Sequence, residues 1–156
     1  LINVVSYVNQ NLDRKAFPKI ATNEPLTHKH AKLWLKKYLL KEQIYSIAFM
    51  NGSIVGASHV DVFHGRRKHG GKLAITVDSE YRGKGIGELL LKDIINQCNL
   101  NGVFLITAEP TEDNLPMINL LKKNGFIFEG KCTKAFHCDS GGYLDLFEFI
   151  SITRDI

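Results

Sequence analysis

The 156 residues match the length of one ordinary domain, and 44% apolar with 23% charged residues is the composition of a globular protein, not of a disordered chain. No apolar run approaches the roughly 20 residues of a bilayer span, and no signal-peptide pattern stands at the N-terminus, so we expect one cytoplasmic domain over residues 1–156 without a membrane partner. The formal charge of +4 suits a ligand with several phosphates, although many cytoplasmic proteins carry as much.

The first forty residues predict two helices. Apolar residues spaced three and four apart favour a helix over residues 1–12, although the Val and Ile content would also suit a strand. The second helix is clearer, with Thr27 as a candidate N-cap and an apolar face that runs from Ala31 to Leu39. Its lysines are interpreted as a solvated face and not as a binding patch.

From residue 44 the pattern changes to short strands that alternate with amphipathic helices. The first two strands flank Asn51-Gly52, a dipeptide typical of tight hairpin turns. The predicted elements are strands at 44–50, 54–63, 72–77, 103–108, 126–137 and 143–152, a loop at 64–71, a helix from 86 with Ile86, Leu89, Leu90 and Ile94 on its inner face, and a helix at about 114–124 that ends at Gly125. This order predicts an α/β or α+β fold, with a mixed sheet covered by helices.

The sharpest feature is the run YRGKGIGE at residues 81–88, between a predicted strand and a predicted helix. Its three glycines let the backbone bend sharply and let a ligand approach the N–H groups that a first helical turn leaves without partners. The helix macrodipole favours an anion at this place, and Arg82 and Lys84 add positive charge. We therefore predict a diphosphate site, against the simpler alternative of a glycine turn that only begins a helix.

Two known classes of phosphate loop do not fit this run. It lacks the Gly-Lys-Ser/Thr ending that supplies a hydroxyl to Mg²⁺ in nucleoside triphosphate loops. It also lacks the Gly-x-Gly-x-x-Gly spacing and the early βαβ unit of a dinucleotide-binding domain. Three cysteines, Cys98, Cys132 and Cys138, form an odd set without metal-ligand spacing, so we expect idle thiols and no metal.

The pattern Arg82-x-x-Gly85-x-Gly87 after a strand resembles the pyrophosphate-binding signature of the GNAT superfamily of acyl-CoA N-acyltransferases. A second block, which begins at Asn114 and closes at Gly125-Phe126, resembles a later helix of the same family. The resemblance covers roughly residues 44–149. It implies a mixed, mostly antiparallel central sheet, opened into a V between two parallel strands and flanked by helices. It also implies a first strand before Leu1, so that residues 1–12 would begin inside the first helix.

The same resemblance implies acetyl-CoA as co-substrate and an amine as acceptor. Backbone groups of the strand before the glycine turn would pair with the pantetheine arm, and the turn would hold the diphosphate. A backbone N–H near Val77 would stabilise the oxyanion. Asn114 would reach the cofactor from the other side, although it or Asp113 also suits a helix cap. The implied cofactor-binding residues are Ile75, Thr76, Val77, Arg82, Gly83, Lys84, Gly85, Ile86, Gly87, Glu88 and Asn114.

A general base is needed because an alkyl amine with a pKa near 10.4 is mostly protonated at neutral pH. Glu109 at a strand end is the first candidate, and His69 in a basic loop is the second. The alternatives are that Glu109 is only an exposed carboxylate at a strand end and that His69 is only a loop histidine. Asp78 and Asp145 are weaker candidates. Many family members carry a proton-donating Tyr where this sequence has Leu121, so the thiolate leaves unassisted or takes a proton from Tyr143 or from water.

Three hypotheses follow for the function. The first is an acetyl-CoA-dependent N-acetyltransferase that acts on a small amine, an amino acid or a peptide, with a C-terminal hairpin at 129–145 that resembles those of small-amine and amino-acid acetyltransferases. The second is a non-catalytic acyl-CoA sensor, favoured by the missing Tyr. The third, a nucleic-acid-binding domain that uses Arg66 to His69 and the basic helix after Thr27, is disfavoured because no nucleic-acid motif is present. Dimers are common in the superfamily, so a homodimer is also considered.

Overall fold

The computed structural model describes residues 40, 42–50, 53–139 and 141–153. The helices expected at residues 1–12 and after Thr27, the strand expected before Leu1 and the Asn51-Gly52 turn lie outside these residues.

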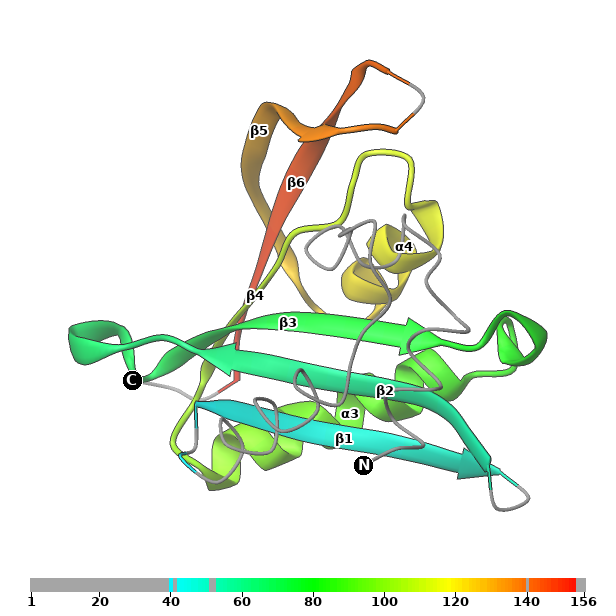
Figure 1. The fold of residues 1–156 in the computed structure, drawn as a ribbon. Helices are drawn as coiled ribbons and strands as arrows, with labels where there is room; N and C mark the ends of the chain where they lie inside the picture. The colour runs from blue at the N-terminus through cyan, green and yellow to red at the C-terminus, as the bar shows by residue number, and fades with distance from the viewer. Residues whose placement is uncertain (1–39, 41, 51–52, 140, 154–156) are drawn as a thin grey trace.

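Six strands form one sheet in the order β1-β2-β3-β4-β6-β5 (Figure 1). Neighbouring strands are antiparallel except for β3 and β4, which are parallel. Within the described ranges two helices flank the sheet, which confirms the expected α+β architecture. The elements are β1 (Gln43–Met50), β2 (Ser53–Val62), β3 (Gly70–Val77), α3 (Ile86–Leu100), β4 (Leu105–Ala108), α4 (Leu115–Lys123), β5 (Ile127–His137) and β6 (Tyr143–Ile152), with short 3₁₀ turns η1 (Gly65–Arg67) and η2 (Ser79–Tyr81).

Two predicted boundaries are corrected by the structure. Strand β3 begins at Gly70, two residues earlier than predicted, and the loop before it contains the turn η1. Strand β4 begins at Leu105 and not at residue 103, because Val103 N–H donates instead to Cys98 O (2.9 Å) and closes the end of α3. Local hydrogen bonding at the helix end therefore removes residues that the apolar pattern alone assigned to the strand.

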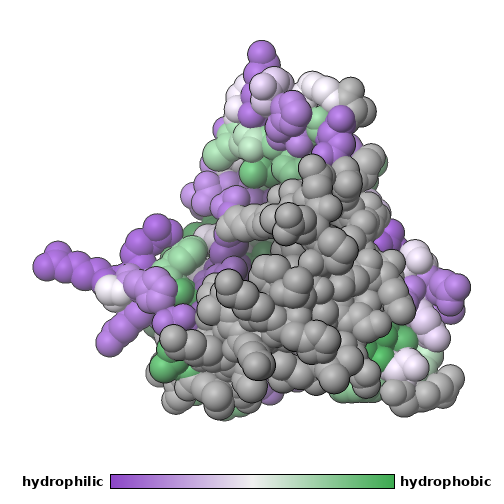
Figure 2. Space-filling model, viewed as in Figure 1, coloured by the Kyte–Doolittle hydropathy of each residue, from purple (hydrophilic) through white to green (hydrophobic). Residues whose placement is uncertain are grey.

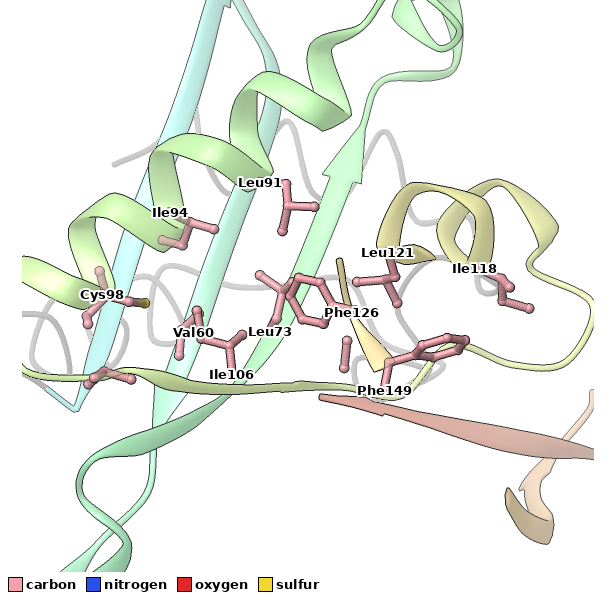
Figure 3. Packing of buried hydrophobic residues seen from close by; sticks show 13 residues of the cluster. Val60, Leu73, Leu91, Ile94, Cys98, Ile106, Ile118, Leu121, Phe126 and Phe149 are labelled. Carbon is pink, nitrogen blue, oxygen red and sulfur yellow. The ribbon is translucent and has the colours of Figure 1, made fainter. Parts of the chain in front are cut away.

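Helix α3 covers one face of the sheet across β1, β2 and β3. Its buried positions recur at helical spacing and include Leu91, which is fully buried, whereas Leu89 is 68% exposed. The prediction of the inner face was therefore wrong at Leu89, and it left out Leu91, which belongs to that face. The main core lies between α3, α4 and the sheet (Figure 3); its largest members are Leu91, Ile94, Ile106, Leu121, Phe126 and Phe149.

Helix α4 begins at a side-chain cap and ends at a glycine. Asn114 Oδ1 accepts a hydrogen bond from Met117 N–H (3.3 Å), which is the geometry of an N-cap. Gly125 adopts a φ of +80°, and Phe126 N–H donates to Leu121 O (3.0 Å), so the predicted left-handed residue after this helix is confirmed. These two ends fix the helix over its buried residues Ile118 and Leu121.

The parallel strands β3 and β4 pair over only three residues, from Gly70 with Leu105 to Lys72 with Thr107. Beyond this point β4 remains paired with β6 through Ala108 and Phe149, while β3 remains paired with β2 as far as Val77. The two strands thus separate after Lys72, in agreement with the expected V-shaped opening.

Candidate functional site

The glycine-rich turn connects the end of β3 to the start of α3. Gly83 and Gly85 have φ values of +74° and +82°, a region that favours glycine because a Cβ would be strained there. The side chain of Arg82 bends back, and its Nε donates to Val77 O (3.0 Å), which ties the turn to the strand. The sharp bend predicted from the three glycines is therefore confirmed, and two of them, Gly83 and Gly85, adopt the left-handed conformation.

The turn presents a row of N–H groups. Within the described part of the chain, no hydrogen bond is recorded for the N–H groups of residues 83–87. The next N–H group, that of Glu88, donates to Gly85 O (3.1 Å), as does that of Leu89. Five consecutive donors at the positive end of a 15-residue helix form a suitable anion site, whereas the amide of Glu88, which the sequence also suggested, is already used.

The carboxylate of Glu88, which lies within the glycine-rich run, is paired with two lysines. Glu88 Oε1 lies 2.9 Å from Lys92 Nζ, and Glu88 Oε2 lies 2.6 Å from Lys123 Nζ. Hydrogen bonds from Lys123 and Lys92 lower the pKa of Glu88 to about 2. Lys84 Nζ stands 5.0 Å from the centre of the Tyr81 ring. The charge of Glu88 is therefore offset by two lysines, while Arg82 and Lys84 of the run carry positive charge.

The backbone N–H and C=O groups of successive β3 residues point alternately toward β2 and toward the opposite edge of the strand. Asp78 N–H donates to Val55 O and Phe63 N–H donates to Gly70 O, so even-numbered residues from 70 to 78 direct their backbone groups toward β2. Ile75 and Val77 consequently direct theirs toward the opening beyond which β4 has turned away. Thr76, which the sequence suggested as a backbone partner of the ligand, belongs to the set that faces β2.

Glu109 follows β4 at the point where the two parallel strands separate. Its carboxylate forms an ion pair with the ammonium group of Lys72; the Lys72 side chain is 17% exposed and that of Glu109 is 30% exposed. Because Lys72 pairs with Thr107 in the sheet and Glu109 comes two residues after Thr107, the two charged groups stand on the same face, at the end of the parallel pairing. The sequence singled out Glu109 but missed Lys72, which strand alternation could have found.

His69 and Tyr143 stand elsewhere. His69 precedes β3 at the end opposite the glycine turn, next to the hydrophilic η1 loop that projects from the molecule (Figures 1 and 2). Its ring stacks on Phe104 with centroids 5.2 Å apart. Tyr143 begins β6, is 59% exposed and packs edge-on against His137. The structure therefore does not bring either side chain to the residues around Glu109.

Two weaker candidates and the Leu121 position have structural roles. Asp78 Oδ1 accepts a hydrogen bond from Glu80 N–H (3.0 Å) and caps η2. Asp145 binds Lys131 Nζ at 2.7 Å and also accepts from Lys134 N–H, and these two hydrogen bonds lower its pKa. Leu121 is fully buried in the main core (Figure 3).

Comparison with known proteins identifies the family. The sequence matches the model of the Acetyltransferase (GNAT) family over residues 9–126, which is more than half of the chain. The chain belongs to the GNAT acetyltransferase family. The matched range contains the glycine-rich turn, Glu109 and Asn114, and it ends at Phe126, before the hairpin of β5 and β6.

Similar GNAT proteins agree with this assignment. An L-amino acid N-acetyltransferase of Escherichia coli, AaaT, is 33% identical over 103 residues, which are 65% of this chain and 63% of AaaT. The chain thus spans less than two thirds of the length of this relative. Among solved structures, an N-acetyltransferase from Staphylococcus aureus has a TM-score of 0.87 at 22% identity and covers 99% of this chain and 93% of its own.

A second solved GNAT structure contains a ligand. The phosphinothricin acetyltransferase of Sinorhizobium meliloti, in complex with AcCoA, has a TM-score of 0.82 at 20% identity, with 98% of this chain and 85% of that one covered. At these identities both structures establish the fold alone.

Three further findings on the described residues of this GNAT chain concern metal binding, membrane spans and thiols. They include no group of three His, Cys, Asp or Glu side chains placed to hold a metal ion. None of the helices in the described ranges is both long and apolar enough to span a membrane. The three cysteines are free, and burial raises the pKa of Cys98 to about 12, which keeps this thiol protonated at neutral pH.

Proposed function

We propose that the chain is an acetyl-CoA-dependent N-acetyltransferase that moves an acetyl group to a primary amine by direct attack on the thioester. The observation that carries this proposal is the row of N–H donors at residues 83–87, beside the edge of β3 that no longer pairs with β4 after Lys72. The L-amino acid N-acetyltransferase among its GNAT relatives supports the same activity.

The cofactor would use both features together. The diphosphate would accept hydrogen bonds from the N–H groups of residues 83–87, with Arg82 and Lys84 adding positive charge. The pantetheine arm would lie along β3 against the backbone groups of Ile75 and Val77. Because Arg82 Nε already occupies Val77 O, the N–H of Val77 is the group left for the arm or for the acetyl oxygen.

Most of the rate acceleration would come from holding the amine and the thioester in register. Glu109 would accept a proton from the amine, whose nitrogen then attacks the acetyl carbon. The carbonyl oxygen becomes an oxyanion, which the N–H of Val77 would stabilise. As the carbonyl re-forms, the carbon–sulfur bond breaks and coenzyme A leaves as its thiolate, while the nitrogen loses its second proton to solvent.

The leaving thiolate needs little help because a thiol pKa near 8.5 is not far above neutrality. Leu121 lies in the core and has no proton to give, and Tyr143 lies at the exposed start of β6. These positions favour unassisted departure or a proton from water over the phenol of Tyr143.

A non-catalytic acyl-CoA sensor is the second candidate function. The observation that favours it is the Lys72–Glu109 ion pair, because a carboxylate held by an ammonium group is a weaker base. A sensor would use the same turn and the same edge of β3, but it would not release coenzyme A.

One experiment separates the two candidates. Release of the coenzyme A thiol is followed with acetyl-CoA and a panel of alkyl amines, amino acids and peptides, while acetyl-CoA affinity is measured by calorimetry. Turnover with at least one amine supports the transferase. Tight binding without turnover on the whole panel supports the sensor, and absence of binding rejects both.

A further inference from the structure

We propose that Lys92 and Lys123, held side by side on Glu88, bind the 3′-phosphate of coenzyme A, so that the protein selects coenzyme A over dephospho-coenzyme A. This inference rests on the proposed function, but it concerns a phosphate that the glycine-rich turn does not hold. It starts from one cluster of charges, in which Glu88 Oε1 lies 2.9 Å from Lys92 Nζ and Glu88 Oε2 lies 2.6 Å from Lys123 Nζ.

The cluster stands beside the turn, on the flank toward α4. A Cβ on Gly87 would lie 3.5 Å from Leu120 Cδ2 and 3.8 Å from Val77 Cγ2, so Gly87 lies between α4 and the end of β3. Glu88 is the next residue, and Lys123 comes three positions after Leu120, which places it on the same side of α4. The ion pair from Glu88 to Lys123 therefore continues the contact between the turn and α4.

The two ends of coenzyme A leave its diphosphate in different directions. One phosphate carries pantetheine, and the other carries the adenosine whose ribose bears the 3′-phosphate. With pantetheine along β3 past Val77, the adenosine leaves the turn on another flank. Arg82 and Lys84 lie within the run that would hold the diphosphate, and Lys84 Nζ stands 5.0 Å from the centre of the Tyr81 ring. The flank toward α4 offers two further cations to the remaining phosphate.

The cluster carries more positive charge than Glu88 needs. One carboxylate is shared by two ammonium groups, so the three side chains together hold a net positive charge. Hydrogen bonds from Lys123 and Lys92 lower the pKa of Glu88 to about 2, so this balance does not change near neutral pH. A phosphomonoester carries a charge of about −1.5 to −2 at pH 7 and therefore matches a cluster with a positive excess.

Both ammonium groups can contact a phosphate without leaving Glu88. Each ammonium has several N–H donors, and its hydrogen bond to one carboxylate oxygen leaves others for a second anion. The Lys92 side chain is 63% exposed and that of Lys123 is 68% exposed, whereas that of Glu88 is 26% exposed. An anion that approaches from solvent therefore meets the lysines before the carboxylate. Because Glu88 already holds the two flexible side chains in place, less side-chain entropy is lost when they close on the phosphate.

The alternative role for the cluster is only to join α3 to α4, and the two roles predict different effects of substitution. Glu88→Gln and Lys123→Met break the same ion pair, so a role in joining the helices predicts the same change in cofactor affinity for both. If the lysines bind the phosphate, Lys123→Met removes a partner of the phosphate, whereas Glu88→Gln removes an anion from beside it. The two substitutions then act in opposite directions.

The test compares the affinities of coenzyme A and dephospho-coenzyme A, which differ only in the 3′-phosphate, by calorimetry. For the unmodified protein we expect coenzyme A to bind at least about tenfold more tightly. Lys123→Met and Lys92→Met should each lower this ratio by about threefold or more, through weaker binding of coenzyme A and little change for dephospho-coenzyme A. Glu88→Gln should raise the ratio, and Lys123→Arg, which keeps the charge, should retain it.

A matched control is Lys131→Met, which breaks the Lys131–Asp145 ion pair on β5 and β6 and should leave the ratio unchanged. Equal affinities of the unmodified protein for the two ligands would overturn the inference and leave the proposed function standing. A ratio that falls alike in Glu88→Gln and Lys123→Met would also overturn it, because the cluster would then act only by joining the helices. Failure of acetyl-CoA to bind would reject the proposed function and this inference with it.

Discussion

Lys123 Nζ in the last turn of α4 lies 2.6 Å from Glu88 Oε2 in the first turn of α3. Lys92 Nζ, one turn further along α3, lies 2.9 Å from the other oxygen of the same carboxylate. The two helices that frame the glycine-rich turn are therefore joined at its rim. The cluster also neutralises a carboxylate beside the predicted diphosphate site, which would otherwise repel the ligand.

The Glu88 cluster predicts a pH-dependent part of the stability. The pKa of Glu88 is lowered from 4.5 to about 2 in the folded protein, so its stabilising effect is present above about pH 4.5 and is lost as pH falls toward 2. Glu88→Gln should therefore flatten the fall in melting temperature over this range. Thermal unfolding at several pH values checks this. The effect should be small and should shrink in high salt, because the groups are exposed; identical pH profiles at low salt would contradict it.

Gly85→Asp should abolish acetyl-CoA binding, because it places a side chain and a negative charge beside the free N–H groups of the turn. The matched control is Gly102→Asp at the other end of α3. Gly102 has a φ of +77° against +82° for Gly85, and neither has an atom within 4 Å of a built Cβ, so backbone strain is comparable. Calorimetric titration with acetyl-CoA should show at least about a hundredfold weaker binding for Gly85→Asp alone. Equal affinities in the two folded variants would refute the site.

Asn114 should contribute to stability through its cap, whatever else it does. Asn114→Ala removes the acceptor of Met117 N–H and should cost about 1 kcal/mol of unfolding free energy. Asn114→Ser keeps a capping oxygen and should recover most of that loss. Urea denaturation measures both. If acetyl-CoA affinity falls in Asn114→Ser while stability is retained, the amide also reaches the cofactor; an Ala variant as stable as the parent would exclude the capping role.

Glu109→Gln should lower kcat/KM by about 10² or more without changing acetyl-CoA affinity, because it removes the proposed base but leaves the diphosphate site intact. Glu129→Gln, an exposed carboxylate on β5, serves as the control and should behave like the parent. Thiol release and calorimetry on the same preparations check both statements. Unreduced turnover in Glu109→Gln would assign the base to another group.

Tyr143→Phe should retain turnover within about twofold, because the phenol is exposed at the start of β6 and coenzyme A can leave as a thiolate. The measurement is kcat at saturating substrates across the pH range. A large loss in kcat would make Tyr143 the proton donor and would require the β5–β6 hairpin to approach the thioester.

Local chemistry explains what could be predicted from the sequence. The glycines at 83 and 85, the cap at Asn114 and the glycine at 125 each act within one turn of backbone, so residue type and spacing were sufficient. The limits of β6 and the class of the sheet followed from apolar runs bounded by turn residues.

Features that depend on distant residues could not be read from the chain. The exchange of Leu89 for Leu91 on the inner face of α3 reflects how the helix is rotated against the sheet. The Lys72–Glu109 pair requires the parallel register of β3 and β4. The Glu88–Lys123 pair joins two residues that are 35 positions apart in the sequence and requires the packing of α3 against α4. Contacts between side chains that are distant in the sequence are therefore the part that sequence spacing predicts least well.

The most direct test of the account is a crystal structure of the chain with acetyl-CoA bound. The account predicts diphosphate oxygens about 2.7–3.2 Å from N–H groups of residues 83–87, with the pantetheine arm along Ile75 and Val77. Phosphorus atoms bound at another surface, with the turn empty, would contradict it.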